Sequence, residues 1–300
     1  MPRLARQEGG RPGRVLAAAF LVAFILAGCQ ASSYQYRWDI FVNSIFRPDS
    51  LILRGVALTL MISLISQTIG VVLGVFGAIG KMAKARPLRY LAGFYVWFFR
   101  GTPLLVQISL IYFGLLVTHL YQWRDITALG AFGTGGVQAG IVALGVNEGA
   151  YMSEIVRAGI LSIDSGQMEA AKSLGMTFGQ AMRRIILPQA ARVIVPPLGN
   201  EFNNMLKTTS LLVIISVPEL YVTFSYKNAS GSTVFHPFEL FLAAAVWYLL
   251  LTTIWGLIQA RIERRLGRSV AGDTGPGLRE RLFGMRSSKP DEIPTISGGR

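Results

Sequence analysis

The sequence predicts an all-α membrane protein with five core transmembrane helices and a possible extra N-terminal helix. First, 52% of the 300 residues are hydrophobic and only 15% are charged, which is more apolar surface than a water-soluble domain of this size buries. Second, five apolar segments reach the roughly 20 residues that a membrane-spanning helix needs. We therefore expect the excess apolar surface to face lipid.

The positions of the basic residues support a membrane protein and predict which loops face the cytoplasm. The net charge is +13, and its clusters alternate with the apolar segments instead of gathering on one surface, which argues against nucleic-acid binding. Because loops rich in Lys and Arg stay in the cytoplasm, residues 159–190 and the C-terminal tail are predicted to be cytoplasmic. The clusters are Arg3, Arg6, Arg11 and Arg14; Lys81, Lys84, Arg86 and Arg89; Arg183, Arg184 and Arg192; Arg261, Arg264, Arg265 and Arg268.

Residues 1–36 form an N-terminal basic segment that allows two interpretations. The apolar stretch at 15–28 is short for a spanning helix but long enough if the helix sits upright. Alternatively, Leu26-Ala27-Gly28-Cys29 resembles a bacterial lipoprotein signal, cut before Cys29 with lipid on its thiol. Cys29 is the only cysteine and there are two histidines, so we predict no disulfide within the chain, no metal site and no cofactor.

The first core segment carries glycines at helical spacing. Gly70, Gly74, Gly77 and Gly80 share one helix face, and such a small-residue face allows two helix backbones to approach closely. Packing within this subunit is the favoured interpretation over a dimer seam. The five core segments run at about residues 52–80, 88–118, 134–158, 191–222 and 237–259.

No nucleotide-binding loop is found in the sequence. The stretch from Gly74 to Lys81 has the wrong spacing for a phosphate-binding loop, and Met82 stands where a Ser or Thr is needed. We therefore expect the chain to hydrolyse nothing itself. Residues 266–300 are rich in Gly, Pro, Ser and charge, and predict a flexible cytoplasmic tail.

Ionisable residues inside the apolar segments are candidates for function, because an unpaired charge in hydrocarbon is costly. Arg100 precedes Gly101-Thr102-Pro103, where the proline predicts a helix break; its guanidinium would bind a substrate carboxylate or lie among cytoplasmic headgroups. Glu148 would bind a substrate ammonium or pair with another helix. Glu154 and Arg157 are three residues apart and predict a local ion pair; a structural role is the favoured interpretation, with gating or coupling as the alternative. Glu201 and Lys207 complete the set.

The cytoplasmic loop has a recognisable pattern. Asp164 is suited to start a short helix, Gly175 to end it, and Thr177 with Gln180 has capping-box spacing for a second helix that Pro188 limits. The anchors are Glu169-Ala170-Ala171, Gly175, Ile185 and Leu187-Pro188.

At these separations the loop resembles the EAA loop of permease subunits of ATP-binding-cassette importers. Three further stretches resemble the branch that imports polar amino acids such as histidine, glutamine, arginine or glutamate, although Thr208 stands where many relatives have Asp. The resemblance covers roughly residues 37–265. The stretches are Arg100 to Gln107, Ala150 to Arg157, and Leu206 to Leu211 with Glu219-Leu220 beyond.

The resemblance implies a type I importer permease fold over 37–265, with its coupling loop at 159–190, in the bacterial cytoplasmic membrane. It implies that Glu169, Ala170, Ala171, Gly175, Leu187 and Pro188 couple the chain to a cytoplasmic ATPase dimer. The other implied partners are a second permease chain, identical or related, an extracytoplasmic binding protein and a polar amino acid. The substrate-pathway candidates are Arg100, Thr102, Glu148, Tyr151 and Lys207. A secondary transporter is the alternative, but no internal repeat supports it.

Overall fold

The computed structural model describes residues 34–230 and 233–267, and every regular element within them is helical. Turns of 3₁₀-helix at Thr127–Gly133 and Thr209–Ile215 and of π-helix at Leu110–Gly114 and Met182–Ile186 join the α-helices. The α-helices are α2 (Trp38–Phe46), α3 (Ser50–Met82), α4 (Arg86–Gly101), α5 (Leu104–Ser109), α6 (Leu115–Val117), α7 (Gly135–Leu161), α8 (Ser165–Ser173), α9 (Phe178–Ala181), α10 (Leu187–Thr208), α11 (Leu220–Ala229) and α12 (Pro237–Gly267).

By length and composition, α3 and α12 are each suited to cross a membrane alone. Three bent helix pairs raise the number to five if each pair counts as one span. This total agrees with the five predicted core segments. The apolar stretch at 15–28, Cys29 and the tail lie outside the described residues.

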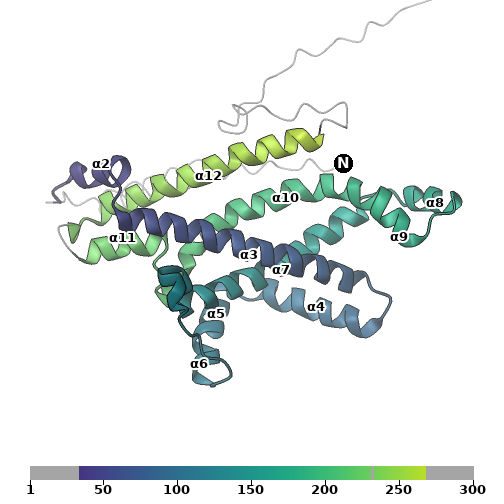
Figure 1. Ribbon diagram of the computed structural model, residues 1–300, viewed down its shortest axis with the longest axis horizontal. Helices are drawn as coiled ribbons and strands as arrows, with labels where there is room; N and C mark the ends of the chain where they lie inside the picture. Colours follow the sequence, from purple (N-terminus) through teal and green to yellow (C-terminus); the bar gives the residue numbers. More distant parts are fainter. Residues whose placement is uncertain (1–33, 231–232, 268–300) are drawn as a thin grey trace, which may run out of the picture.

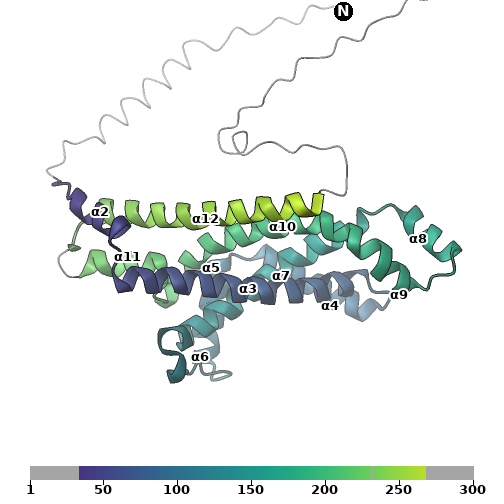
Figure 2. The same ribbon diagram turned by 45° about the horizontal axis from the view of Figure 1, so that its top comes forward.

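The helices form one elongated bundle (Figures 1 and 2). α8 and α9 lie at one end, beside the C-terminal end of α3. α2, α11 and the start of α3 lie at the other end, and α12 runs along α10. The domain boundaries at residues 36 and 266 remain predictions.

The glycine face of α3 packs within the chain, as predicted. A Cβ atom on Gly74 would overlap the Met152 side chain on α7 and come within 2.9 Å of its carbonyl carbon. Gly70 and Gly77 meet α7 in the same way, whereas Gly80 meets α4. The α3–α7 pair is the most extensive helix contact in the described structure, and it forms the rigid centre of the bundle.

Segment 88–118 is not one straight helix. The chain bends by 106° between α4 and α5, at the Thr102-Pro103 step where the sequence predicted a break. As a result α5 and α6 leave the direction of α4 (Figure 1).

The prediction that Pro188 limits the second loop helix is wrong. Pro188 lies in the first turn of α10, directly after the π-turn, and it does not stop the helix although it has no backbone N–H to donate. The chain therefore continues without interruption from α9 through the π-turn into α10. α10 continues past Pro196 and Pro197 to Thr208. The observed helix thus begins four residues before the predicted span at 191–222, and a 3₁₀-helix follows it at Thr209–Ile215.

Candidate functional site

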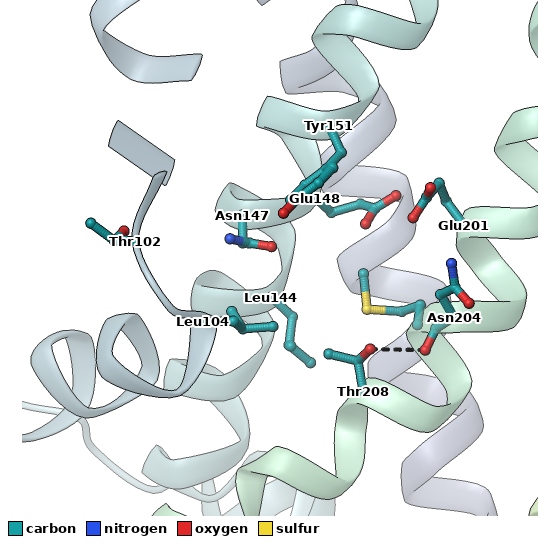
Figure 3. A pocket seen from close by; sticks show the side chains of 10 residues that line it. Thr102, Leu104, Leu144, Asn147, Glu148, Tyr151, Glu201, Asn204 and Thr208 are labelled. Atoms are coloured by element: carbon teal, nitrogen blue, oxygen red, sulfur yellow. Dashed lines mark hydrogen bonds between the residues drawn. The ribbon is translucent and has the colours of Figure 1, made fainter. Parts of the chain in front are cut away.

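A cavity of about 200 Å³ opens between α7, α10 and the break that separates α4 from α5. Figure 3 shows Glu148 on α7 and Glu201 on α10 with their carboxylates turned toward each other. The cavity is thus polar and carries two acidic groups from opposite walls. Its lining residues are Thr102, Leu104, Leu144, Asn147, Glu148, Tyr151, Glu201, Asn204, Met205 and Thr208.

The helix break beside the cavity is held by two buried amides. Pro103 has no N–H, so the carbonyl of Phe99 loses its helical donor. Gln107 Nε2 donates to that carbonyl at 2.9 Å and Asn147 Nδ2 donates to it at 3.0 Å. Gln107 also donates to the Thr102 carbonyl and accepts from Asn147. A backbone break within the bundle is tolerated because these side chains replace the missing bonds.

We expect Gln107→Leu to lower the free energy of unfolding by about 1–3 kcal/mol, because it leaves the Phe99 and Thr102 carbonyls short of donors in a dry environment. Thermal unfolding of the detergent-solubilised protein measures this as a lower midpoint. Gln122→Leu, the same change at an exposed loop residue, serves as control. An unchanged midpoint for Gln107→Leu would mean that the helix break does not need the hydrogen bonds of the Gln107 side chain.

The structure gathers three of the five substrate-pathway candidates. Thr102, Glu148 and Tyr151 line the cavity. Arg100 does not line it; its guanidinium carbon lies 5.2 Å from the centroid of the Tyr151 ring, a cation–π distance. Lys207 is exposed and also lies off the lining.

Sequence reasoning missed the amides of the site. Gln107, Asn147 and Asn204 are uncharged, so a search for ionisable residues in apolar segments passed over them. Glu201 met that criterion but was not assigned to the pathway. A search for polar side chains within two turns of a predicted helix break would have found Gln107.

Glu154 and Arg157 form the ion pair that their spacing predicts, with Arg157 Nη2 2.8 Å from Glu154 Oε2. Lys81 at the end of α3 also pairs with Glu154, which the sequence did not predict. The cluster ties the ends of α3 and α7 together.

The loop helices are capped as the sequence predicts. The Asp164 side chain accepts from the N–H of Gly166, and Thr177 and Gln180 exchange both bonds of a capping box.

Gly175 ends α8 with φ at +80°, the left-handed region that favours glycine. The N–H of Gly175 donates to the carbonyl of Lys172, and that of Met176 to Ala171, which is the Schellman pattern of a helix end.

The exposed surface of the loop mixes charge and apolar groups. Glu169 and Ala170 are exposed, but Ala171 is buried against the chain itself, so only one of the two alanines faces outward. Leu174 is 82% exposed and Phe178 is 62% exposed. Leu187 and Pro188 are exposed at the start of α10.

The family model described as "Binding-protein-dependent transport system inner membrane component" matches residues 70–268. The arginine transport system permease protein ArgU of Corynebacterium glutamicum is 39% identical, covering 84% of this chain and 80% of its own length. The L-cystine transport system permease protein TcyB of Bacillus subtilis is 37% identical, covering 78% of this chain and 93% of its own.

Solved structures show the same fold. The crystal structure of an amino acid ABC transporter with histidines superposes with a TM-score of 0.67 at 36% identity, covering 77% of this chain and 100% of that one. An inward-facing MetNI methionine ABC transporter gives a TM-score of 0.56 at 21% identity, covering 72% and 96%.

Proposed function

The chain belongs to the family of binding-protein-dependent transport system inner membrane components, and from this premise we propose that it carries a polar amino acid through the cavity between α7 and α10. As a member of this family it is a permease subunit of an amino acid ATP-binding-cassette importer, a transporter component with the type I fold. Its relatives are permease proteins of an arginine transport system, an L-cystine transport system and a probable glutamine transporter, the last two from Bacillus subtilis.

The observation that carries the coupling part of the proposal is the exposed α8–α9 pair at one end of the bundle. The positive-inside rule puts that end in the cytoplasm. Glu169, Ala170 and Gly175 on this pair, with Leu187 and Pro188 beyond it, form the surface that docks on the ATPase. Leu174 and Phe178 supply apolar contact area that the sequence did not point to. Ala171 supports the pair from its buried side.

Family membership implies an ATPase and a binding protein as partners in general. We assign ATP hydrolysis to a separate cytoplasmic ATPase dimer, which needs a second permease chain for its other docking surface. An extracytoplasmic binding protein delivers the amino acid. In the bacterial cytoplasmic membrane, ATP-driven closure of the ATPase pair moves the docked helices and changes the side on which the cavity opens.

The residues of the site take distinct roles in this mechanism. Thr102, Glu148 and Tyr151 meet the amino acid inside the cavity. Arg100, which contacts the Tyr151 ring, and exposed Lys207 lie along its approach. Glu154 with Arg157 and Lys81 is a structural cluster.

The proposed function is tested by uptake of radiolabelled amino acids into proteoliposomes that contain the permease, its ATPase and its binding protein. Uptake is expected only with ATP and all components, because this chain has no means of its own to use ATP. A hydrolysis-deficient ATPase in the same complex is the control. Uptake driven by an ion gradient without ATP would identify a secondary transporter instead.

A further inference from the structure

A second cavity lies at the end of the bundle opposite α8 and α9. It measures about 280 Å³ and opens between α2, the start of α3 and the end of α11, at the end where Figures 1 and 2 show these three elements. It shares no lining residue with the cavity between α7 and α10. The proposed transport mechanism does not use it.

The helices around this second cavity place it at the level of the lipid headgroups. Residues 55–80 of α3 contain no Asp, Glu, Lys or Arg, and the same is true of residues 240–260 of α12. At a rise of about 1.5 Å per residue, each stretch is roughly 30–40 Å long, enough to cross the hydrocarbon core of a bilayer. Arg54 and Glu239 are the first charges beyond these stretches on the side of α2. The N–H of Arg37, a lining residue, donates to Glu239 at 2.7 Å, so the cavity lies at this level, on the side away from the cytoplasm.

One face of α2 is apolar and exposed. Trp38, Val42 and Phe46 recur at four-residue spacing and are all exposed, Phe46 by 77%. The ring of Trp38 stacks on that of Tyr36 and meets that of Phe238 edge-on, with centroid distances of 6.0 and 6.1 Å. Aromatic side chains gather at the boundary between headgroups and acyl chains, and helices with one apolar face lie in that plane. The face of α2 therefore fits a lipid surface.

The cavity beside this face carries one cation more than its carboxylates neutralise. Arg37 Nη2 lies 2.7 Å from Asp39 Oδ2, and Lys227 Nζ lies 2.5 Å from Asp49 Oδ2. The hydrogen bond from Arg37 holds the pKa of Asp39 below its usual range, so this carboxylate is charged at neutral pH. Arg47 also lines the cavity, is exposed, and forms no ion pair within the part of the chain that the structure describes. The cavity thus has a net positive charge that an anion would balance.

We propose that this cavity binds the phosphate of an anionic phospholipid, with the apolar face of α2 against the adjoining acyl chains. Arg47 supplies the charge, and its planar guanidinium fits two phosphate oxygens at once. Asn43 also lines the cavity and adds an uncharged donor. A free phosphate ion would use the charge alone, whereas the exposed apolar face next to it favours a molecule that carries acyl chains. The lipid site goes beyond the proposed function and does not depend on which amino acid is carried.

Native mass spectrometry of the full-length chain in detergent micelles tests the site, by counting bound lipid as phosphatidylglycerol or phosphatidylcholine is added. Both lipids carry a phosphate and acyl chains, but only phosphatidylglycerol has a net negative charge. We expect it to bind at least about fivefold more tightly, the factor that one Arg near the headgroups contributes. Arg47→Gln is expected to remove this preference and Arg47→Lys, which keeps the charge, to retain it. Unchanged binding of phosphatidylcholine shows that each variant is folded.

Arg124→Gln is the matched control, because it makes the same change at an exposed arginine of the loop between α6 and α7, outside the cavity lining. It is expected to prefer phosphatidylglycerol as the wild type does. Inorganic phosphate in millimolar excess is expected to leave the bound lipid in place, since it cannot replace the contacts of the acyl chains.

Three results would overturn the lipid site. Equal affinity of the wild type for the two lipids, or an unchanged preference in Arg47→Gln, removes the role of the cavity charge. Displacement of the lipid by inorganic phosphate assigns the cavity to a free anion. Weaker binding of the proposed extracytoplasmic binding protein by Arg47→Gln, with the lipid preference intact, assigns this surface to that protein. Lipid binding needs neither ATP nor cargo, so a failure of ATP-driven uptake in proteoliposomes is a failure of the proposed function alone.

Discussion

Replacing Gly175 by valine is expected to lower ATP-driven uptake by at least about tenfold while the protein still inserts in the membrane. A side chain at this φ of +80° costs at least about 1–2 kcal/mol, and more for a β-branched residue. No atom lies within 4 Å of the position a Cβ would take, so the strain comes from the backbone alone. The helix end would relax out of its Schellman geometry and tilt α8 out of the orientation that the proposed docking on the ATPase requires.

Gly179→Val is the control for this experiment. Gly179 lies in α9 with helical backbone angles, and its added Cβ would also meet open space. Uptake and ATPase stimulation are measured in the same proteoliposomes. Full coupling in Gly175→Val would show that the angle between α8 and α9 is not needed for docking.

The second large effect is expected at Gly74, in the centre of the α3–α7 contact. In Gly74→Ala the new methyl would overlap Met152 and approach its backbone carbonyl carbon at 2.9 Å, which a change of rotamer cannot relieve. Forcing two packed helices apart costs about 1–3 kcal/mol or more. We expect a lower yield of folded protein and a clearly lower midpoint of thermal unfolding in detergent.

Gly256→Ala on α12 provides the comparison, because nothing lies within 4 Å of a Cβ added there. Its unfolding midpoint is expected to match the wild type. If Gly74→Ala unfolds at the wild-type temperature, the two helices are less rigidly packed than the structure indicates.

The features predicted correctly from sequence are local ones. The capping box at Thr177 and Gln180 and the helix end at Gly175 depend on a few neighbouring residues, so their pattern can be recognised in the sequence. The break at Pro103 is local for the same reason, since a missing N–H acts on the preceding turn. The glycine face of α3 required one further assumption, that a small-residue face packs against the same chain.

The features that escaped prediction depend on distant residues. Asn147 caps the Phe99 carbonyl across 48 positions of sequence, and Lys81 reaches Glu154 across 73. Whether Glu148 faces Glu201 depends on how α7 and α10 are rotated, which helical periodicity does not specify. Pro188 was misinterpreted because the same residue ends one helix or begins another, depending on where the first turn falls.

α9, the π-turn and α10 form one continuous helical segment, which connects the α8–α9 loop to the wall of the cavity. From Leu187 to Glu201 the helical rise of about 1.5 Å per residue places the carboxylate roughly 20 Å from the helix start. The segment bends most easily at Pro196-Pro197, where two backbone N–H donors are missing. Gln259 Nε2 of α12 donates to the Pro196 carbonyl at 3.2 Å and supports the helix at this point. A tilt imposed at the proposed docking surface would therefore displace Glu201 in the wall of the cavity. Under the proposed function, the motion driven by the ATPase and the wall of the cavity would therefore share one helical segment.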